Sequence, residues 1–565
     1  MKNRKQFVVL NSLVLMLAAG SVLAGCSKSP AEPASSAAAT QGAAATDAAT
    51  NKVEPFNVSV YIGDAGFQQP APDNKIYKLM KDKLGVTFQF DFLAGDSNQK
   101  AGVMIAGGDY PDIMTANTKF TDAGAYIPLE DLIEKNAPNL KKHYEAVWNQ
   151  MKDPKDGHIY ILPNYGVYTG ELHATYYSGP AFWIQKAVLK EAGYPKIKTL
   201  DEYFALIKNY KEKHPEIDGK PTIGFDILNY DWRNWGLLNP PQHLMGHPND
   251  GGVVVENNVA SIFADKDPAK QYYKKLNEIN NQGLLDKESF VQNFDQYMAK
   301  ISSGSVLGMF DQHWSFQAAE DALTTQDKND RTYVGLPLMF NASDKDYYRD
   351  LPPLNLNNGF GISVNAKDPV RILKMLDALM SEEWQKTLTW GIQGEDYQVN
   401  DKGMFSRTEQ QRKNATDATW KLSNTAEAFY KFAPKWEGSF PDGNATAPND
   451  QPDEYYAGQK AIDKELLDAY GYKTYIDFFS KPPANPVYYP AWSITLEDGS
   501  PAKIANTKLN ELGTKYLPKA ILSTPDQFDN VWNEYTGQIK KVDVKAYEDR
   551  INEQIQWRIK NWSTK

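Results

Sequence analysis

Cysteine, basic clusters and long apolar runs are what this sequence of 565 residues has least of. Its single cysteine cannot form an intramolecular disulfide and excludes a cysteine-based zinc or iron–sulfur site. Lysine and arginine together number 61 against 71 aspartate and glutamate residues, which gives a formal net charge of −10. Without a block of about five or six basic residues the chain lacks the footprint of a nucleic-acid-binding protein, so we expect no nucleic acid partner.

No stretch beyond the amino-terminal segment offers the ~18 consecutive apolar residues that a membrane-spanning helix needs. Hydrophobic residues make up 41% of the chain and charged residues 23%, close to the averages of globular proteins. The composition therefore excludes a polytopic membrane protein and wholesale disorder. The length allows about three or four ordinary domains or two large lobes.

Enzyme signatures are also scarce. The sequence has no Walker phosphate loop, HExxH or GxSxG motif. Gly95-Asp96-Ser97 resembles an esterase nucleophile block, but no Asp-x-x-His partner stands near the carboxyl terminus, and Gly359-Phe360-Gly361 lacks the third glycine of a dinucleotide loop. A glycosidase carboxylate pair cannot be located from sequence. We therefore expect that this protein is not an enzyme. The alternative is a secreted enzyme that acts on polysaccharides.

Two histidines, His243 and His247, have the i, i+4 spacing of metal ligands. Gly246 and three flanking prolines argue against the rigid helix that would aim both rings at one ion, so we expect polar groups of a loop. No segment has the alternating oxygen ligands and central glycine of a calcium loop. We expect neither a metal nor a cofactor.

The amino terminus reads as a targeting segment. Three basic residues among the first five precede a mostly apolar stretch that ends in Leu23-Ala24-Gly25-Cys26, which resembles a bacterial lipobox. The resemblance implies a signal peptide over residues 1–25, cleavage before Cys26 and a lipid on its sulfur. Residues 27–52 are rich in alanine and lack aromatics, so we expect residues 26–55 to form a lipidated, flexible tether. The protein is then anchored at the outer face of the cell membrane.

From residue 56 onward the hydrophobic pattern becomes regular. Alternating and helical periodicities predict a β-α-β-α-β order, with strands near 58–62, 86–92 and 112–115 and helices near 76–84, capped by Asp73, and 99–106. This order predicts an α/β fold with a mostly parallel sheet and a ligand crevice beyond the carboxyl ends of its strands. Two of those ends lie near Gly63-Asp64 and Ala116-Asn117.

A second unit follows after residue 175. Thr199 to Glu202 forms a capping box for a helix, and Asp267-Pro268 opens another. A helix near 293–301 leads to a strand over 306–310, whose end delivers Asp311 to Trp314. Further along, the pattern predicts a strand over 359–364 and a long helix from Asp368-Pro369.

Four segments in this order resemble a known family. They are NKIYKLMKDKLGVTFQF, GDYPDIM, KISSGSVLGMFDQHW and GFGISVNAKDPVRILKMLDALMSEEWQKTLTWGIQGEDYQV. Together they are similar to the extracellular solute-binding proteins of carbohydrate ABC importers (family 1), and more narrowly to the large Gram-positive lipoproteins that take up oligosaccharides. The resemblance covers about residues 56–565.

The resemblance implies a two-lobed, periplasmic-binding-protein-like fold of type II, with discontinuous lobes joined by a hinge. Residues 56–176 with about 359–430 would form lobe 1, and residues 177–358 with about 431–565 would form lobe 2. It also implies a carbohydrate ligand of oligosaccharide size and ABC permease subunits as partners. Relatives that bind uronate polymers carry a calcium site, and whether this chain has one stays open.

Aromatic side chains supply the best candidates for ligand contact. The chain has 13 Trp, 32 Tyr and 24 Phe, and sugars require broad aromatic faces beside hydrogen-bonding groups. Most aromatics must pack in cores, so we select those near the ends of regular structure, with their polar neighbours. These are Trp232, Arg233, Trp235, Asp311, His313, Trp314, Trp390 and Glu395.

Further candidates come from the resemblance or from position. The resemblance implies Asn117 and Lys119, after the Pro-Asp-Ile motif, and Tyr177 at the first crossing between lobes. Maltose binders place a tryptophan after that motif, which this sequence lacks, so maltose is doubtful. Tyr61 and Asp64 follow the first strand.

The sequence therefore predicts a monomeric, lipid-anchored protein that captures a carbohydrate between two lobes and delivers it to a permease. A non-sugar solute such as a peptide is one alternative, and a surface adhesion or sensing module is another.

Overall fold

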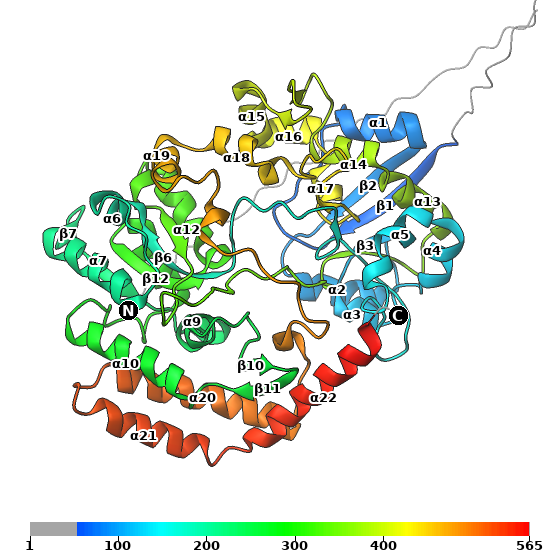
Figure 1. Ribbon diagram of the computed structural model, residues 1–565. Coiled ribbons are helices and arrows are strands. Elements are labelled where there is room, and N and C mark those ends of the chain that lie inside the picture. The colour runs from blue at the N-terminus through cyan, green and yellow to red at the C-terminus, as the bar shows by residue number, and fades with distance from the viewer. Residues whose placement is uncertain (1–53, 564–565) are drawn as a thin grey trace, which may run out of the picture. The chain divides into compact units, whose positions relative to one another are not determined.

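The computed structural model describes residues 54–563. The predicted signal peptide, Cys26 and almost all of the tether lie outside the described residues. Within residues 54–563, no helix combines the length and the apolar character that crossing a bilayer demands. The folded body consists of two α/β lobes, each built around its own sheet and hydrophobic core (Figure 1).

The sheet of the first lobe has five strands in the order β2-β1-β3-β14-β4. β1 pairs in parallel with both β2 and β3, and β14 runs antiparallel to its two neighbours. The predicted mostly parallel sheet is confirmed, with β14 as its one reversed strand. The strands are β1 (Phe56–Ile62), β2 (Val86–Phe92), β3 (Ile113–Thr115), β14 (Gly359–Ile362) and β4 (Leu162–Pro163).

The residue that caps the helix between β1 and β2 stands one position later than the sequence predicts. α1 (Lys75–Leu84) is capped by Asn74 and not by Asp73. The Asn74 Oδ1 accepts hydrogen bonds from two backbone N–H groups of the first turn, and its Nδ2 donates to the carbonyl oxygens of Leu422 and Thr425, both at 2.8 Å. An amide can do both and a carboxylate cannot, so Asn74 also ties α1 to a distant segment. The next helix is α2 (Ser97–Gly107).

The sheet of the second lobe has the order β13-β6-β12-β9. β12 runs parallel to β9 and antiparallel to β6. The strand predicted over 306–310 continues to Gln312, and a helix follows without a loop, so Asp311 lies in the strand and His313 and Trp314 in the first turn of the helix. The elements are β6 (Pro180–Gln185), β9 (Ile223–Asp226), β12 (Val306–Gln312), β13 (Tyr333–Leu336) and α12 (His313–Thr325).

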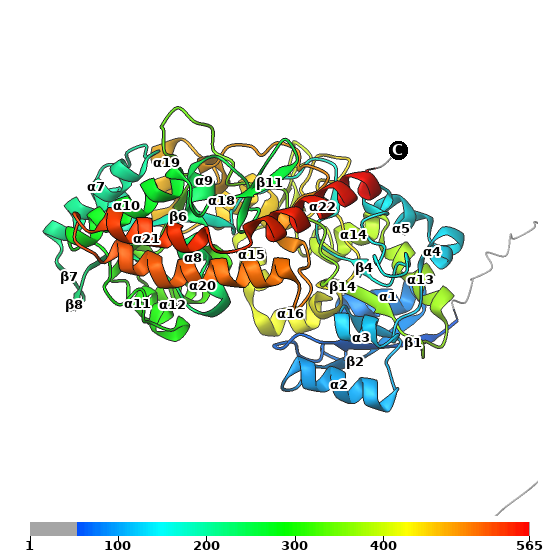
Figure 2. The ribbon, with the colours of Figure 1, turned by 90° about the horizontal axis from the view of Figure 1, so that it is seen from below.

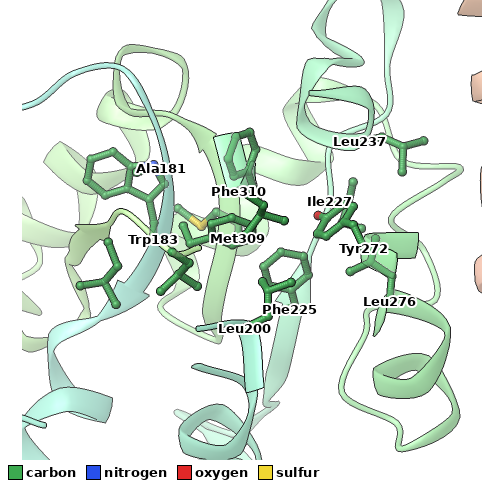
Figure 3. Close-up of a cluster of buried hydrophobic side chains, with 14 of the residues drawn as sticks. Ala181, Trp183, Leu200, Phe225, Ile227, Leu237, Tyr272, Leu276, Met309 and Phe310 are labelled. Atoms are coloured by element: carbon green, nitrogen blue, oxygen red, sulfur yellow. The ribbon is translucent and has the colours of Figure 1, made fainter. Parts of the chain in front are cut away.

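Apolar side chains fix β12 in the middle of this lobe. Met309 and Phe310 of β12 pack with Phe225 of β9 and Tyr272, and all four are at most 1% exposed (Figure 3). Burial of each such side chain stabilises the fold by about 1.5–3 kcal/mol. The residues at the carboxyl end of β12 therefore start from a rigid strand.

Helix caps confirm the predicted starts in this lobe. Thr199 and Glu202 form the capping box of α7 (Leu200–Lys213), and Asn293 caps α11 (Phe294–Ser303). Asp267 begins α10 (Asp267–Asn281). The other elements up to β14 are α3 (Thr118–Asp122), α4 (Glu130–Asn136), α5 (Pro138–His143), η1 (Glu145–Val147), β5 (Tyr168–Thr169), α6 (Lys186–Glu191), β7 (Glu216–Ile217), β8 (Lys220–Pro221), η2 (Asp231–Arg233), α8 (Trp235–Leu238), α9 (Pro240–Leu244), β10 (Val253–Glu256), β11 (Val259–Ile262) and η3 (Asn329–Arg331).

After β14 the chain is mostly helical. Asp368 caps α13 as predicted. The elements are α13 (Pro369–Leu379), α14 (Glu382–Thr389), β15 (Gln398–Val399), β16 (Phe405–Ser406), α15 (Glu409–Thr416), α16 (Ala418–Asn424), α17 (Glu427–Tyr430), β17 (Glu437–Gly438), η4 (Pro448–Asp450), α18 (Pro452–Gly458), α19 (Ala461–Tyr470), η5 (Tyr475–Phe478), η6 (Ala491–Ser493), α20 (Pro501–Ile521), α21 (Phe528–Ile539) and α22 (Val544–Trp562).

The three carboxyl-terminal helices α20, α21 and α22 lie side by side against α10 and the β10–β11 hairpin (Figure 1, Figure 2). The buried Asn277 of α10 donates from Nδ2 to the carbonyl oxygens of Ala520, Ile521 and Ser523, at 3.1, 3.0 and 2.7 Å. These are groups that a helix end leaves without an intrahelical partner. Asn277 therefore fastens the end of α20 to the second lobe.

We expect Asn277→Ala to lower the free energy of unfolding by about 1–3 kcal/mol, because it removes three hydrogen bonds and leaves the Ile521 carbonyl without a side-chain donor. Urea denaturation checks this, and Asn530→Ala, an exposed asparagine on α21, is the matched control. Equal midpoints for Asn277→Ala and the wild type would show that α20 is held by other contacts.

Candidate functional site

Three tryptophans gather at one surface of the second lobe. The ring centroids of Trp232 and Trp235 are 4.9 Å apart, and those of Trp235 and Trp314 are 5.4 Å apart. The rings of Trp232 and Trp314 lie nearly parallel, at 10° and 6.2 Å. Trp232 is 60% exposed and Trp314 is 47% exposed. We call these three residues the tryptophan cluster; exposed aromatic patches of this kind mark surfaces that bind a partner.

Two neighbouring strands position the cluster. β9 and β12 are parallel neighbours, so their carboxyl ends lie at the same edge of the sheet. Trp314 is the second residue of α12, which follows β12 directly, whereas Trp232 and Trp235 lie in η2 and α8 on the connection after β9. The fold thus brings Trp314 beside Trp232 and Trp235, which come from a distant part of the sequence.

Arg233 packs on the indole of Trp232. Asp231, which opens η2, has a left-handed backbone conformation with φ 46° that non-glycine residues rarely adopt. Its carboxylate accepts from the Arg233 backbone N–H at 3.0 Å and pairs with Nη1 of Arg233 at 2.5 Å. The guanidinium lies over the rings of Trp232 and Phe294, at 4.6 and 4.3 Å. Cation–π contact therefore orients the indole, and Asp231 balances the charge.

Asp311 lies beneath the cluster and not on its surface. Its carboxylate accepts hydrogen bonds from Trp235 Nε1 at 3.0 Å, the Tyr297 hydroxyl at 2.9 Å and the Gln312 backbone N–H at 2.7 Å. Burial raises the pKa of Asp311 to about 6, and these hydrogen bonds oppose the shift. The structure therefore makes Asp311 a residue that positions Trp235, where the sequence predicted a contact with ligand.

His313 is also buried, because the strand runs into the helix without a loop. Its Nε2 lies 2.5 Å from Oε2 of Glu320, and its ring packs on Tyr176 and Trp183 with centroids 4.8 and 5.2 Å apart. His313 thus anchors the first turn of α12, where Trp314 stands. The sequence predicted that His313 contacts ligand, whereas in the structure it is buried and supports the turn that carries Trp314.

In the first lobe, the ends of β1 and β3 form a small polar cavity of about 60 Å³. Tyr61, Asp64 and Asn117, which the sequence predicted to contact ligand, line it. Tyr61 is 1% exposed, and its hydroxyl has no hydrogen-bond partner within residues 54–563. Burial, with the charges of Asp91 and Asp64, raises the pKa of Tyr61 to about 12. A buried hydroxyl without a hydrogen-bond partner lowers the stability of the fold. A polar group that entered the cavity and bonded to Tyr61 would remove this cost.

Backbone geometry keeps this cavity narrow. The Gly63 N–H donates to Thr115 Oγ1 at 2.8 Å, and a Cβ at position 63 would meet that oxygen at 2.8 Å. Asn117 caps α3 by accepting from the Lys119 N–H at 2.9 Å. Lys119 itself is exposed on α3 and does not line the cavity.

Three residues that the sequence predicted to contact ligand lie away from both the tryptophan cluster and the polar cavity of the first lobe. Trp390 is 1% exposed, packs with Tyr397 and Phe405, and donates from Nε1 to the Ala445 carbonyl at 3.0 Å. Tyr177 is buried, and its hydroxyl donates to the Tyr348 carbonyl at 2.6 Å. Both belong to cores, because apolar side chains from distant segments cover them. Glu395 is exposed, with Oε2 3.5 Å from Lys75 Nζ.

The predicted loop around His243 is instead the helix α9, and His243 is fully buried. Its ring lies 5.1 Å from that of Tyr348 and 5.7 Å from that of Phe310. Burial lowers the pKa of His243 to about 3, with a smaller contribution from His247. Among the described residues, no group of three or more His, Cys, Asp and Glu side chains is arranged to hold a metal ion.

Sequence reasoning missed a cavity of about 460 Å³ next to the tryptophan cluster. Trp232 and Trp235 line it together with Trp492, which is 55% exposed, and residues of α20. No sequence pattern could have joined residues 232 and 492, because only the packing of the carboxyl-terminal helices brings them together.

A family model described as bacterial extracellular solute-binding protein matches residues 59–386. The fructooligosaccharide ABC transporter substrate-binding protein FusA of Streptococcus pneumoniae is 25% identical over 351 residues, which cover 58% of this chain and 62% of FusA. The polygalacturonan/rhamnogalacturonan-binding protein YtcQ of Bacillus subtilis is 25% identical over 421 residues, or 71% of this chain and 76% of YtcQ. Lipoprotein LipO of Bacillus subtilis is 23% identical over 367 residues, or 61% and 68%.

Solved structures have the same fold. An HMO-binding, ABC-transporter-associated solute-binding protein from Bifidobacterium longum infantis aligns with a TM-score of 0.60 at 18% identity and covers 90% of this chain and 99% of its own. FusA of Streptococcus pneumoniae in complex with kestose aligns with a TM-score of 0.56 at 20% identity, over 90% of this chain and 100% of its own. At these identities the likeness establishes the fold.

The raised pKa of Asp311 predicts a pH effect on stability. Because the folded protein holds this proton more tightly than the unfolded chain, the contribution of Asp311 to the free energy of unfolding falls as the pH rises from about 4 to 6. The Asp311→Asn variant lacks this titration. We expect the wild type to lose about 2 kcal/mol relative to Asp311→Asn over that interval, measured by urea denaturation at each pH. Parallel pH profiles would contradict the assignment.

Proposed function

The chain belongs to the bacterial extracellular solute-binding proteins, and on that premise we propose that it captures an oligosaccharide for an ABC importer. The observation that carries this proposal is the tryptophan cluster at the carboxyl ends of β9 and β12. Indole faces stack on the flat C–H faces of sugar rings, while amides and hydroxyls bond to the sugar hydroxyls. A peptide ligand carries charges, and its site needs exposed side chains of the opposite charge. Beside the tryptophan cluster, Asp231 and Arg233 instead form an ion pair with each other.

The polar cavity of the first lobe supplies the second half of the proposed site. Tyr61 offers an unpaired hydroxyl there, with Asp64 and Asn117 beside it. A ligand that contacts both lobes shifts the population toward a closed form through the contacts available only in that form. We propose that a permease recognises the closed form with ligand bound. We also expect the protein to act as a monomer.

Names of relatives support the transport role and the sugar. FusA is named a substrate-binding protein of a fructooligosaccharide ABC transporter, YtcQ binds polygalacturonan and rhamnogalacturonan, and LipO is named a lipoprotein. FusA and YtcQ are named as binding proteins, which favours a receptor over an enzyme for this chain. The lipobox at Cys26 adds an anchor on the outer face of the membrane.

The tryptophan cluster is tested by Trp314→Ala. A thermal-shift screen of plant-wall, starch and fructan oligosaccharides selects the ligand, since a ligand at 100 times its Kd stabilises the fold by about 2.7 kcal/mol. We expect Trp314→Ala to weaken binding about thirtyfold, or about 2 kcal/mol, in calorimetry. The urea midpoint should hardly change, because Trp314 is about half exposed.

The control is Trp557→Ala, which removes an exposed tryptophan far along the chain on α22. Unchanged affinity in Trp314→Ala would remove the cluster from the site. Release of shorter products from any glycan by the wild type would favour the polysaccharide-acting enzyme.

The anchor is tested by Cys26→Ser. This change removes the sulfur that would carry the lipid, so we expect no incorporation of labelled fatty acid into the protein in growing cells. Ser27→Ala is the matched control and should be labelled like the wild type. Equal labelling of Cys26→Ser would show that the lipobox assignment is wrong.

A further inference from the structure

The cavity of about 460 Å³ beside the tryptophan cluster has the chemical character of a binding site. It shares Trp232 and Trp235 with the cluster and adds Trp492 from η6. Its volume falls in the range of about 300–1,000 Å³ that small-molecule sites occupy. The two features are therefore continuous through the shared indoles.

Polar groups on the cavity wall have no partners in the protein. The side chains of Asn234, Asn239, Asn506, Asn510 and Lys503 line the cavity. Across residues 54–563, none of these five makes a side-chain hydrogen bond or ion pair. Four neutral amides offer both donors and acceptors, and no carboxylate lines the cavity. The four amides match the hydroxyl groups of a sugar, and Lys503 supplies a further donor to them.

Trp492 is exposed yet held in place. The turn η6 that carries it is fixed by Asp250, whose Oδ1 accepts from the Ala491 N–H at 2.8 Å, and by Arg558, which donates to the Pro490 carbonyl at 2.7 Å and to Ser493 Oγ at 3.1 Å. A rigid indole loses little conformational entropy when a ligand stacks on it.

A glycine permits the close approach of this turn. Gly251 has a φ of 78°, and a Cβ there would lie 2.9 Å from the Cβ of Trp492. Opposite, Lys503, Asn506 and Asn510 stand at i, i+3 and i+7 on one face of α20. Since α20 is fastened by Asn277, the amides are presented from a rigid helix.

We propose that this cavity is an extension of the sugar site, which takes uncharged monosaccharide units beyond those that stack on the tryptophan cluster. The proposal rests on the proposed function, because it takes the cluster as the place where the first units bind. It makes the protein sensitive to chain length: short oligosaccharides reach only the cluster, and longer ones also contact Trp492 and α20.

The test is calorimetry with fructo-oligosaccharides and malto-oligosaccharides as two neutral length series, and with oligogalacturonates as an acidic series. We expect Trp492→Ala, and separately the double variant Asn506→Ala/Asn510→Ala, to weaken binding of the longer neutral members about tenfold and to leave the shortest bound member unchanged. Trp314→Ala should weaken every member. Trp557→Ala, with an exposed tryptophan outside the cavity, should change none.

The outcomes separate the two proposals. If Trp314→Ala weakens binding and the cavity variants have no effect at any length, the extension is wrong and the proposed function stands. A loss in the cavity variants that is equal at all lengths also overturns the extension. Tighter binding of the acidic series than of both neutral series overturns the choice of an uncharged ligand. Binding of none of the three series overturns both proposals. Asn506 is half-buried and Asn510 is exposed, and the urea midpoint of the double variant verifies that it is folded.

Discussion

The hydrogen bonds of the Asp311 carboxylate are the interaction on which the candidate site depends. Through one buried group they join the end of β12 to Trp235 of α8 and to Tyr297 of α11. A carboxylate buried among apolar residues would be unstable without such donors. With them it fixes three elements at once, and the exposed tryptophans stand on that frame. The strand β12 below them is held in the core by the buried side chains of Met309 and Phe310, so it gives the tryptophans a rigid base.

The same design recurs where the chain crosses itself over long distances. Asn74 ties α1 to residues near 422 and 425, and Asn277 ties α10 to the end of α20. In both cases one buried amide satisfies carbonyl groups that a helix end or loop leaves open. Lobes built from separate segments need such links, because local helix and strand contacts cannot hold distant segments together.

Local rules predicted part of the elements. The Thr199 capping box, the strands β1, β2, β3 and β14 and the place of Trp314 after a strand depend on a few neighbouring residues, and the structure has them. The strands β4, β6, β9 and β13 were not predicted. Burial could not be predicted in this way. Trp390 and Tyr177 stand near the ends of elements as Trp314 does, yet distant side chains cover them. Trp492 was missed for the converse reason, since only the packing of α20 and α22 sets it beside Trp232.

Four carboxyl groups with raised pKa values are engaged in hydrogen bonds within the fold. Burial raises the pKa of Asp226, Asp250, Asp311 and Asp350 to about 6 in each case, which is the range that a general acid would need. Each carboxylate, however, is already bonded within the fold: Asp226 to Ser289 and Gln292, Asp250 to the Ala491 N–H, and Asp350 to Tyr489. Asp250 fixes the turn of Trp492 as Asp311 fixes Trp235. Two of the four groups, Asp250 and Asp311, therefore keep indoles of the proposed sugar site in fixed positions.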